Sequence, residues 1–225
     1  MNPLKVAIRT GDLDGLRRLL DDDPGLATAR IGGRTPLHIA TDWPGHFPNS
    51  AATIAVLIAA GADVNARFEG GVHRETPLHW AASSDDVEAL DALLDAGADI
   101  DAGGGVIGGG TALADARVFA QWHAAHRLVE RGAATTIVDS ATLGLVGRVE
   151  NQVSGATSDE VNAAFWGACH GDQRACAEFL LDRGAELDWI PPWEEMTPLD
   201  AAQRSEAEIV AWLRERGARS ATEIS

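Results

Sequence analysis

Residues 35–40 read TPLHIA, and residues 76–81 repeat this stretch as TPLHWA. Weaker copies follow, TALADA at residues 111–116 and TPLDAA at residues 197–202. A short segment that returns along a chain is the signature of a repeat architecture, in which each unit buries its apolar face only against its neighbours. The repeat therefore decides the fold before any single residue does.

A second marker lies downstream of each copy, where a Gly-Ala pair comes directly after an apolar helical stretch. Glycine at that place fits the left-handed turn that ends an α-helix. The Thr-Pro pair marks the opposite end, because Thr caps a new helix and Pro is tolerated in its first turn. Each unit is thus predicted to be a helix, a short turn, a second helix and an extended loop. The Gly-Ala pairs begin at Gly61, Gly97, Gly132, Gly184 and Gly217.

This pattern resembles the ankyrin repeat, which has a period of about 33 residues and the mark T-P-L-H-x-A. Residues 76–102 fit it without a gap. The resemblance implies an all-α ankyrin-repeat solenoid of about six to seven helix-turn-helix units with hairpin-like finger loops, one or two of them degenerate. We expect one domain over residues 1–225, with units near 3–30, 34–66, 75–102, 110–134, 138–156, 159–187 and 196–218.

The chain is acidic, with a formal net charge of −16. Such a charge argues against nucleic acid, because phosphate binding needs clustered Lys and Arg. It favours either a basic protein partner or simple solubility, and the sequence does not decide between them. No stretch reaches the ~18 apolar residues of a membrane span, and the start lacks the features of a signal peptide. We therefore expect no membrane association and a cytoplasmic location.

Two pairs of polar residues have a structural interpretation. In ankyrin proteins the residue matching His38 and His79 hydrogen-bonds the backbone between neighbouring repeats, and the resemblance implies the same role here. Cys169 and Cys176 occupy apolar repeat positions, which predicts buried free thiols. A redox role would need a cationic neighbour, and His170 is adjacent in sequence.

Two other segments resemble chemical motifs only in form. His123 and His126 share a helical face at metal-ligand spacing, but no third ligand is near in sequence, so a solvated face is favoured. Residues 103–110 read GGGVIGGG and contain G-x-G-x-x-G, but no strand precedes it and no parallel sheet is expected. A finger loop with Val106 and Ile107 at its tip is the favoured interpretation. No catalytic motif, cofactor or metal site is indicated.

Tryptophan is unusually frequent, with seven Trp and no Tyr. Trp80, Trp122 and Trp212 are predicted to be core residues, and Trp166 fits either environment. Three more lie in loops, where Trp either concentrates binding energy or folds back as a local plug. They are Trp43, in an insertion with two prolines at residues 43–50, and Trp189 and Trp193.

The resemblance also implies where a partner binds, namely the concave side made of finger tips and the exposed ends of first helices. We expect the binding residues on this side to be Trp43, Phe68, His73, Arg74, Ser83, Ser84, Ile107, Phe119, His170, Trp189, Trp193 and Glu194.

The favoured function is a non-enzymatic protein-binding module or adaptor, including an accessory subunit of another enzyme, which uses an acidic concave surface and loop tryptophans. The alternative is a small-molecule-binding protein or an unusual enzyme with a concave pocket lined by Trp, His and Arg, in which His170 and Glu194 move a proton.

Overall fold

The computed structural model describes residues 2–204 and 208–224, and the fold over these residues is entirely helical apart from one isolated bridge, Ile31 to Arg34. The all-α prediction is confirmed. The chain divides into two compact units, residues 1–134 (unit 1) and 135–225 (unit 2). Whether all repeats form one domain stays a prediction.

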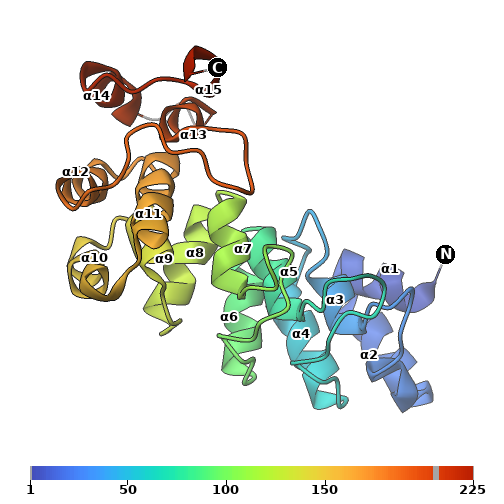
Figure 1. Ribbon diagram of the computed structural model, residues 1–225. Coiled ribbons are helices and arrows are strands. Elements are labelled where there is room, and N and C mark those ends of the chain that lie inside the picture. The colour runs from blue at the N-terminus through green and yellow to red at the C-terminus, as the bar shows by residue number, and fades with distance from the viewer. Residues whose placement is uncertain (1, 205–207, 225) are drawn as a thin grey trace. The chain divides into compact units, whose positions relative to one another are not determined.

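Unit 1 consists of four successive helix pairs, each followed by a loop (Figure 1). The second helix of each pair packs beside the second helix of the next, as α4 does on α6. The elements are α1 (Pro3–Thr10), α2 (Leu13–Asp22), the 3-10 helix η1 (Pro24–Ala27), α3 (Pro36–Ala40), α4 (Ser50–Ala59), α5 (Pro77–Ser83), α6 (Val87–Asp95), α7 (Ala112–Val118) and α8 (Trp122–Glu130).

Unit 2 contains three helix pairs and a short closing helix, and α11 packs on both α9 and α13. Five of the seven helix pairs lie within the predicted repeat ranges, whereas α9 begins one residue before the range 138–156 and α11 one residue before the range 159–187. The elements are α9 (Ile137–Thr142), α10 (Val146–Gln152), the 3-10 helix η2 (Val153–Gly155), α11 (Ser158–His170), α12 (Arg174–Asp182), α13 (Pro198–Arg204), α14 (Ile209–Glu215) and α15 (Ala221–Ile224).

The repeat signature determines both ends of each pair. In α3, Thr35 caps the helix start and Pro36 occupies its first turn, as predicted. At the other end Gly61 and Gly97 adopt φ values of 96° and 90°, which a residue with a Cβ rarely adopts. A leucine four positions before each Gly-Ala pair is fully buried. These leucines are Leu57, Leu93, Leu128, Leu180 and Leu213.

A ladder of side chains ties three of the repeats to the repeat that follows each of them in the same unit. Asn65, four positions after a Gly-Ala glycine, accepts a hydrogen bond of 2.8 Å from the amide of Asp99 in the next repeat. Asp101 repeats this contact with Ala134 at 2.9 Å. In unit 2 Asp188 does the same with the amide of Arg219 at 2.8 Å. The loops therefore keep a fixed register within each unit.

Three tryptophans were predicted to be core residues, and the structure confirms only Trp212, which is buried. Trp80 and Trp122 are half-exposed. Trp80 replaces a smaller apolar residue of the repeat pattern, and its ring lies against the preceding finger loop instead of the interior. The prediction for Trp80 was wrong because its ring packs on Phe68 of the finger loop and on His38, at ring-centre distances of 5.4 and 5.0 Å.

Candidate functional site

The two histidines of the recurring T-P-L-H element, His38 and His79, are structural. The amide of Thr35 donates to Nδ1 of His38, and Nε2 of His38 lies 3.2 Å from the carbonyl oxygen of Glu75 in the next repeat. His79 makes the matching contacts with Thr76 and with the carbonyl of Gly110. Burial lowers the pKa of His38 to about 4, so this imidazole stays neutral at neutral pH. The role implied by the repeat is confirmed.

The two cysteines are buried free thiols, as predicted. Burial raises the pKa of both, and that of Cys176 reaches about 11. A thiol with a raised pKa is a poor nucleophile at neutral pH, so a redox role has no support in the structure.

His123 and His126 lie on an exposed face, and Nδ1 of His123 is 2.7 Å from a carboxylate oxygen of Asp85. Within residues 2–204 and 208–224, no cluster of three His, Cys, Asp or Glu side chains could hold a metal ion. The same part of the chain has no helix long and apolar enough to cross a bilayer.

The glycine-rich loop at residues 103–110 is a finger that folds on itself. The amide of Gly104 donates to the carbonyl of Gly109 at 2.8 Å, and the amides of Val106 and Ile107 donate to the carboxylate of Asp115. These amides are the groups that a phosphate would need, and a carboxylate already occupies them. The finger interpretation of the loop is therefore favoured over a nucleotide site.

The insertion at residues 43–50 is anchored to both neighbouring repeats. The amide of His46 donates to Asp86 at 2.6 Å, and its Nε2 lies 3.2 Å from the carbonyl of Ser84. On the other side, Asn49 donates to the carbonyl of Gly11 at 3.0 Å. Trp43 is 77% exposed, so it projects from a fixed loop and does not plug the neighbouring repeats.

Unit 2 carries the other loop tryptophans in a segment that we call the tryptophan loop, residues 187–196. The rings of Trp189 and Trp193 meet edge to face at 5.6 Å. Trp189 is half-buried, whereas Trp193 is 62% exposed and Ile190 is 42% exposed. The loop has three acidic residues and no basic one. It therefore combines exposed apolar surface with negative charge.

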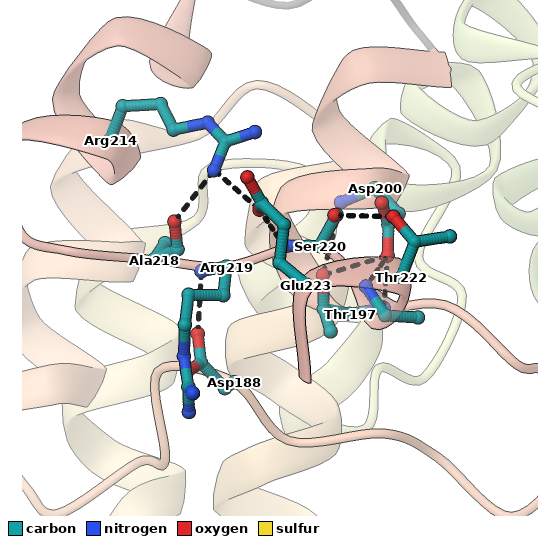
Figure 2. A network of polar contacts seen from close by, with 10 residues as sticks. Asp188, Thr197, Asp200, Arg214, Ala218, Arg219, Ser220, Thr222 and Glu223 are labelled. Atoms are coloured by element: carbon teal, nitrogen blue, oxygen red, sulfur yellow. Dashed lines mark hydrogen bonds and ion pairs between the residues drawn. The ribbon is translucent and has the colours of Figure 1, made fainter. Parts of the chain in front are cut away.

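Polar contacts hold the tryptophan loop at its base (Figure 2). Asp188 pairs with Arg219, whose Nε is 2.8 Å from the carboxylate. At the loop's other end, Asp200 accepts from Thr197 and from the amide of Ala221. Arg214 pairs with Glu223 at 2.6 Å, which fixes the segment that carries Arg219.

Some predicted site residues make contacts with one another, and others do not. Ser83 and Ser84 lie at the end of α5, and Phe119 ends α7 with 42% of its surface exposed. His170 stacks on Trp166 at 5.6 Å, and Glu194 pairs with Arg204 at 3.8 Å. The proton-transfer alternative gains no support from these contacts. A cavity of about 620 Å³ lies elsewhere, between α4 and α6.

Sequence reasoning missed one group of side chains beside the predicted residues Phe68 and Arg74. The guanidinium of Arg34 lies 5.3 Å from the ring centre of Trp80 and 5.9 Å from that of Phe68. The rings of Phe68 and Trp80 are 5.4 Å apart. A signal was present, because Arg34 directly precedes the Thr-Pro mark and follows two glycines.

Comparison with known proteins finds an ankyrin repeat match in part of the chain and the same fold in a solved structure. The ankyrin repeat family model matches residues 32–68 and 73–104. The crystal structure of the human ASB11 ankyrin repeat domain superposes with a TM-score of 0.60 and 21% identity, over 96% of this chain and 98% of that one.

Curated relatives match over part of the chain. The palmitoyltransferase AKR1 of Kluyveromyces lactis is 37% identical over 103 residues, which is 42% of this chain and 12% of that protein. Protein fem-1 homolog A of Danio rerio is 41% identical over 80 residues, or 32% of this chain. This chain spans only 12% of each relative's length.

Proposed function

Because this chain carries ankyrin repeats and has the fold of an ankyrin repeat domain, we propose that it is a non-enzymatic protein-binding module that uses the tryptophan loop of unit 2. Ankyrin repeats are generally protein–protein interaction modules. The exposure of Trp193 carries the proposal, because Trp is the residue in which binding energy at interfaces most often concentrates.

The surroundings of Trp193 support a partner with basic character. Glu194 and Glu195 follow Trp193, and Asp188 lies at the base of the same loop. A partner segment with an apolar side chain and flanking Lys or Arg matches both features, since charge complementarity speeds and orients association. The loop is held at both ends, which reduces the conformational entropy that binding must remove.

Several of the other predicted residues lie in unit 1. Trp43 and Phe119 present apolar surface at the ends of first helices in unit 1, and Ser83 and Ser84 end the first helix of the repeat between them. His73 and Ile107 lie in finger loops. We propose that these residues form a contact surface of unit 1 in its own right.

A site-specific photo-crosslinker tests this proposal in the protein's own host. The crosslinking amino acid replaces Trp189 in the full chain, and a matched version replaces the exposed His126 on α8. We expect one crosslinked protein from position 189 that is absent from position 126. Replacing Trp193 with Ala and Glu194 with Gln should abolish that crosslink. An identical crosslinking pattern from both positions contradicts the proposal.

A further inference from the structure

The side chain of Arg34 has unused hydrogen-bonding capacity. Two aromatic rings hold its guanidinium, those of Phe68 and Trp80. Its Nε is buried and has no hydrogen-bond partner, and Arg34 forms no ion pair with any residue in the described part of the chain. A guanidinium presents five donors in a planar fork that fits a carboxylate. Arg34 is therefore a positioned cation without an anion.

Backbone pairing brings further arginines to the same place. The amide of Phe68 donates to the carbonyl of Glu75 at 2.8 Å, and the amide of Glu69 donates to the carbonyl of Gly33 at 3.2 Å. These bonds lay residues 30–34 against the finger at residues 67–75. We call the resulting group the arginine–aromatic cluster; it consists of Arg30, Arg34, Arg67, Phe68, Arg74 and Trp80.

The charges in this cluster are only partly neutralised. Arg30 pairs with Glu69 at 3.1 Å, and Arg67 donates to the carbonyl of Arg74 at 3.0 Å. The side chain of Arg74 is exposed and has no polar partner among residues 2–204 and 208–224. Residues 30–34 and 67–75 together hold four Arg and two Glu, in a chain whose net charge is −16. This surface is locally basic on an acidic protein.

Apolar surface lies beside the free cations. Val72, at the tip of the same finger, is 93% exposed, and Trp80 is half-exposed. An aromatic ring under a guanidinium adds an attraction of about 0.5–1 kcal/mol at an exposed site and keeps the cation in one orientation. The cluster is thus suited to a ligand with both carboxylates and an apolar side chain.

We propose that the arginine–aromatic cluster binds an acidic segment of a partner protein, in which one carboxylate pairs with Arg34, a second pairs with Arg74, and an apolar side chain packs on Trp80 and Val72. The proposed acidic ligand rests on the proposed protein-binding function and makes it more specific. Unit 1 would bind an acidic segment, whereas the tryptophan loop would bind a basic one. Nucleic acid is disfavoured, because four arginines on a chain of net charge −16 supply little phosphate neutralisation.

An array of short peptides tests the proposal with the intact chain. Each peptide carries Asp or Glu around one apolar residue, and a matched peptide has Asn or Gln in place of every acid. We expect selected acidic peptides to bind and their amide counterparts to bind at least about 10-fold more weakly, since charge-assisted bonds are roughly twice as strong as neutral ones. Equal binding of both sets, or no binding by either, overturns the proposal.

The indole N–H signals of the seven tryptophans locate the binding event in an NMR titration. An acidic peptide should shift the Trp80 signal and leave the Trp193 signal unchanged. A basic peptide should do the reverse if the proposed function of the tryptophan loop is also correct. Loss of only one response therefore shows which of the two proposals fails. A single-stranded oligonucleotide that shifts Trp80 more than the acidic peptides overturns the choice of ligand.

Three variants link the response to the arginines. Arg34→Gln should weaken the selected peptide by about 10-fold, and Arg34→Lys should recover only part, because an ammonium lacks the planar fork. Arg74→Gln should weaken binding by several-fold without disturbing the fold, since this side chain has no polar partner in the structure. The control is Arg17→Gln on α2, which should bind as the unchanged protein does. Unaltered affinity in both Arg34→Gln and Arg74→Gln overturns the proposal.

Discussion

Two helices of unit 1 and three of unit 2 begin at a threonine in the same way but complete the cap with different chemistry. In unit 1, the third helical residue after Thr35 or Thr76 is a buried histidine that also reaches the next repeat. In unit 2, the equivalent residue after Thr136, Thr157 and Thr197 is a carboxylate. A capping box needs only an acceptor at this position, so the choice between imidazole and carboxylate is free to set other properties.

The loops of the two units differ in parallel. Unit 1 has a basic finger surface in which Arg34 stacks on aromatic rings, and unit 2 has an acidic loop in which Trp193 is exposed. The repeat scaffold thus determines where these loops lie, whereas the charge of the loop residues differs from one unit to the other. We expect four perturbations to affect the two units differently.

The largest effect is expected from removing a buried histidine cap. His38→Ala removes the acceptor for the amide of Thr35 and the contact with the carbonyl of Glu75, in a place closed to water. We expect a loss of about 3 kcal/mol in the free energy of unfolding, measured by urea denaturation. Glu160→Ala in unit 2 is the matched change at an exposed cap and should lower the free energy of unfolding much less, because the cap is open to water. Equal losses in the free energy of unfolding of the two variants would contradict the expected difference between the histidine cap and the carboxylate cap.

Acidification should act on the histidine caps first. The pKa of His38 is about 4 in the folded chain, against an ordinary value of 6.5. The unfolded chain therefore binds the proton more readily, so the stability from neutral His38 is complete above about pH 6.5 and is lost as the pH falls through 4. Protonation of His38 should therefore lower the free energy of unfolding by about 2 kcal/mol between pH 7 and pH 5.

Urea denaturation of the wild type and of His38→Gln at both pH values isolates this effect. Arg30, Arg34 and His79 face His38 and oppose its protonation, and the variant keeps all three. In unit 2, hydrogen bonds from Thr157 lower the pKa of Glu160, so that cap weakens only below its ordinary pKa of 4.5. The wild type and His38→Gln should differ in pH dependence above pH 5; parallel curves would argue against a neutral His38.

Aromatic truncations should separate packed rings from exposed ones. Trp80→Ala removes a ring that contacts Phe68, His38 and the guanidinium of Arg34, and should cost about 1–2 kcal/mol. Trp193→Ala removes a ring that is mostly in water, and should change stability by less than about 0.5 kcal/mol. Thermal unfolding of the two variants measures the difference, and a larger loss for Trp193 would mean that this ring is packed.

The smallest effect is expected from surface ion pairs. In unit 1, Arg131 bridges Asp91 and Asp95 at 2.6 Å each, joining α8 to α6. Arg131→Ala should lower the free energy of unfolding only slightly, and high salt should reduce this loss because solvent reaches the pairs. In unit 2, Arg216 is 3.7 Å from Glu178 and should contribute less by its charge. Denaturation at low and high salt compares the two.

Much of the fold could be predicted from the sequence, because the repeat marks themselves make the contacts. Thr35, Pro36 and His38 cap a helix, and Gly61 ends one, so the letters that recur are the residues that fix local geometry. The comparison with the ankyrin repeat family and with ASB11 confirms this identification.

The site was harder to predict, because side-chain exposure depends on contacts between repeats. Trp80 was expected in the core from its position alone, but its ring lies on a finger of the preceding repeat. Trp189 and Trp193 looked equivalent in the sequence, and only the loop geometry makes one half-buried and the other exposed. Arg34 was overlooked because its place between two glycines and the Thr-Pro mark does not by itself show that its guanidinium will stack on two rings distant in sequence.

The ladder of Asn65, Asp101 and Asp188 has a consequence for how the chain is made. Each rung joins a loop to an amide of the next repeat, at a separation of 34, 33 and 31 positions. A repeat leaving the ribosome thus finds its docking partner already formed, and no rung has to wait for distant chain to be synthesised. Along the ladder, the order of translation can also be the order of assembly, with each repeat serving as the template for its successor.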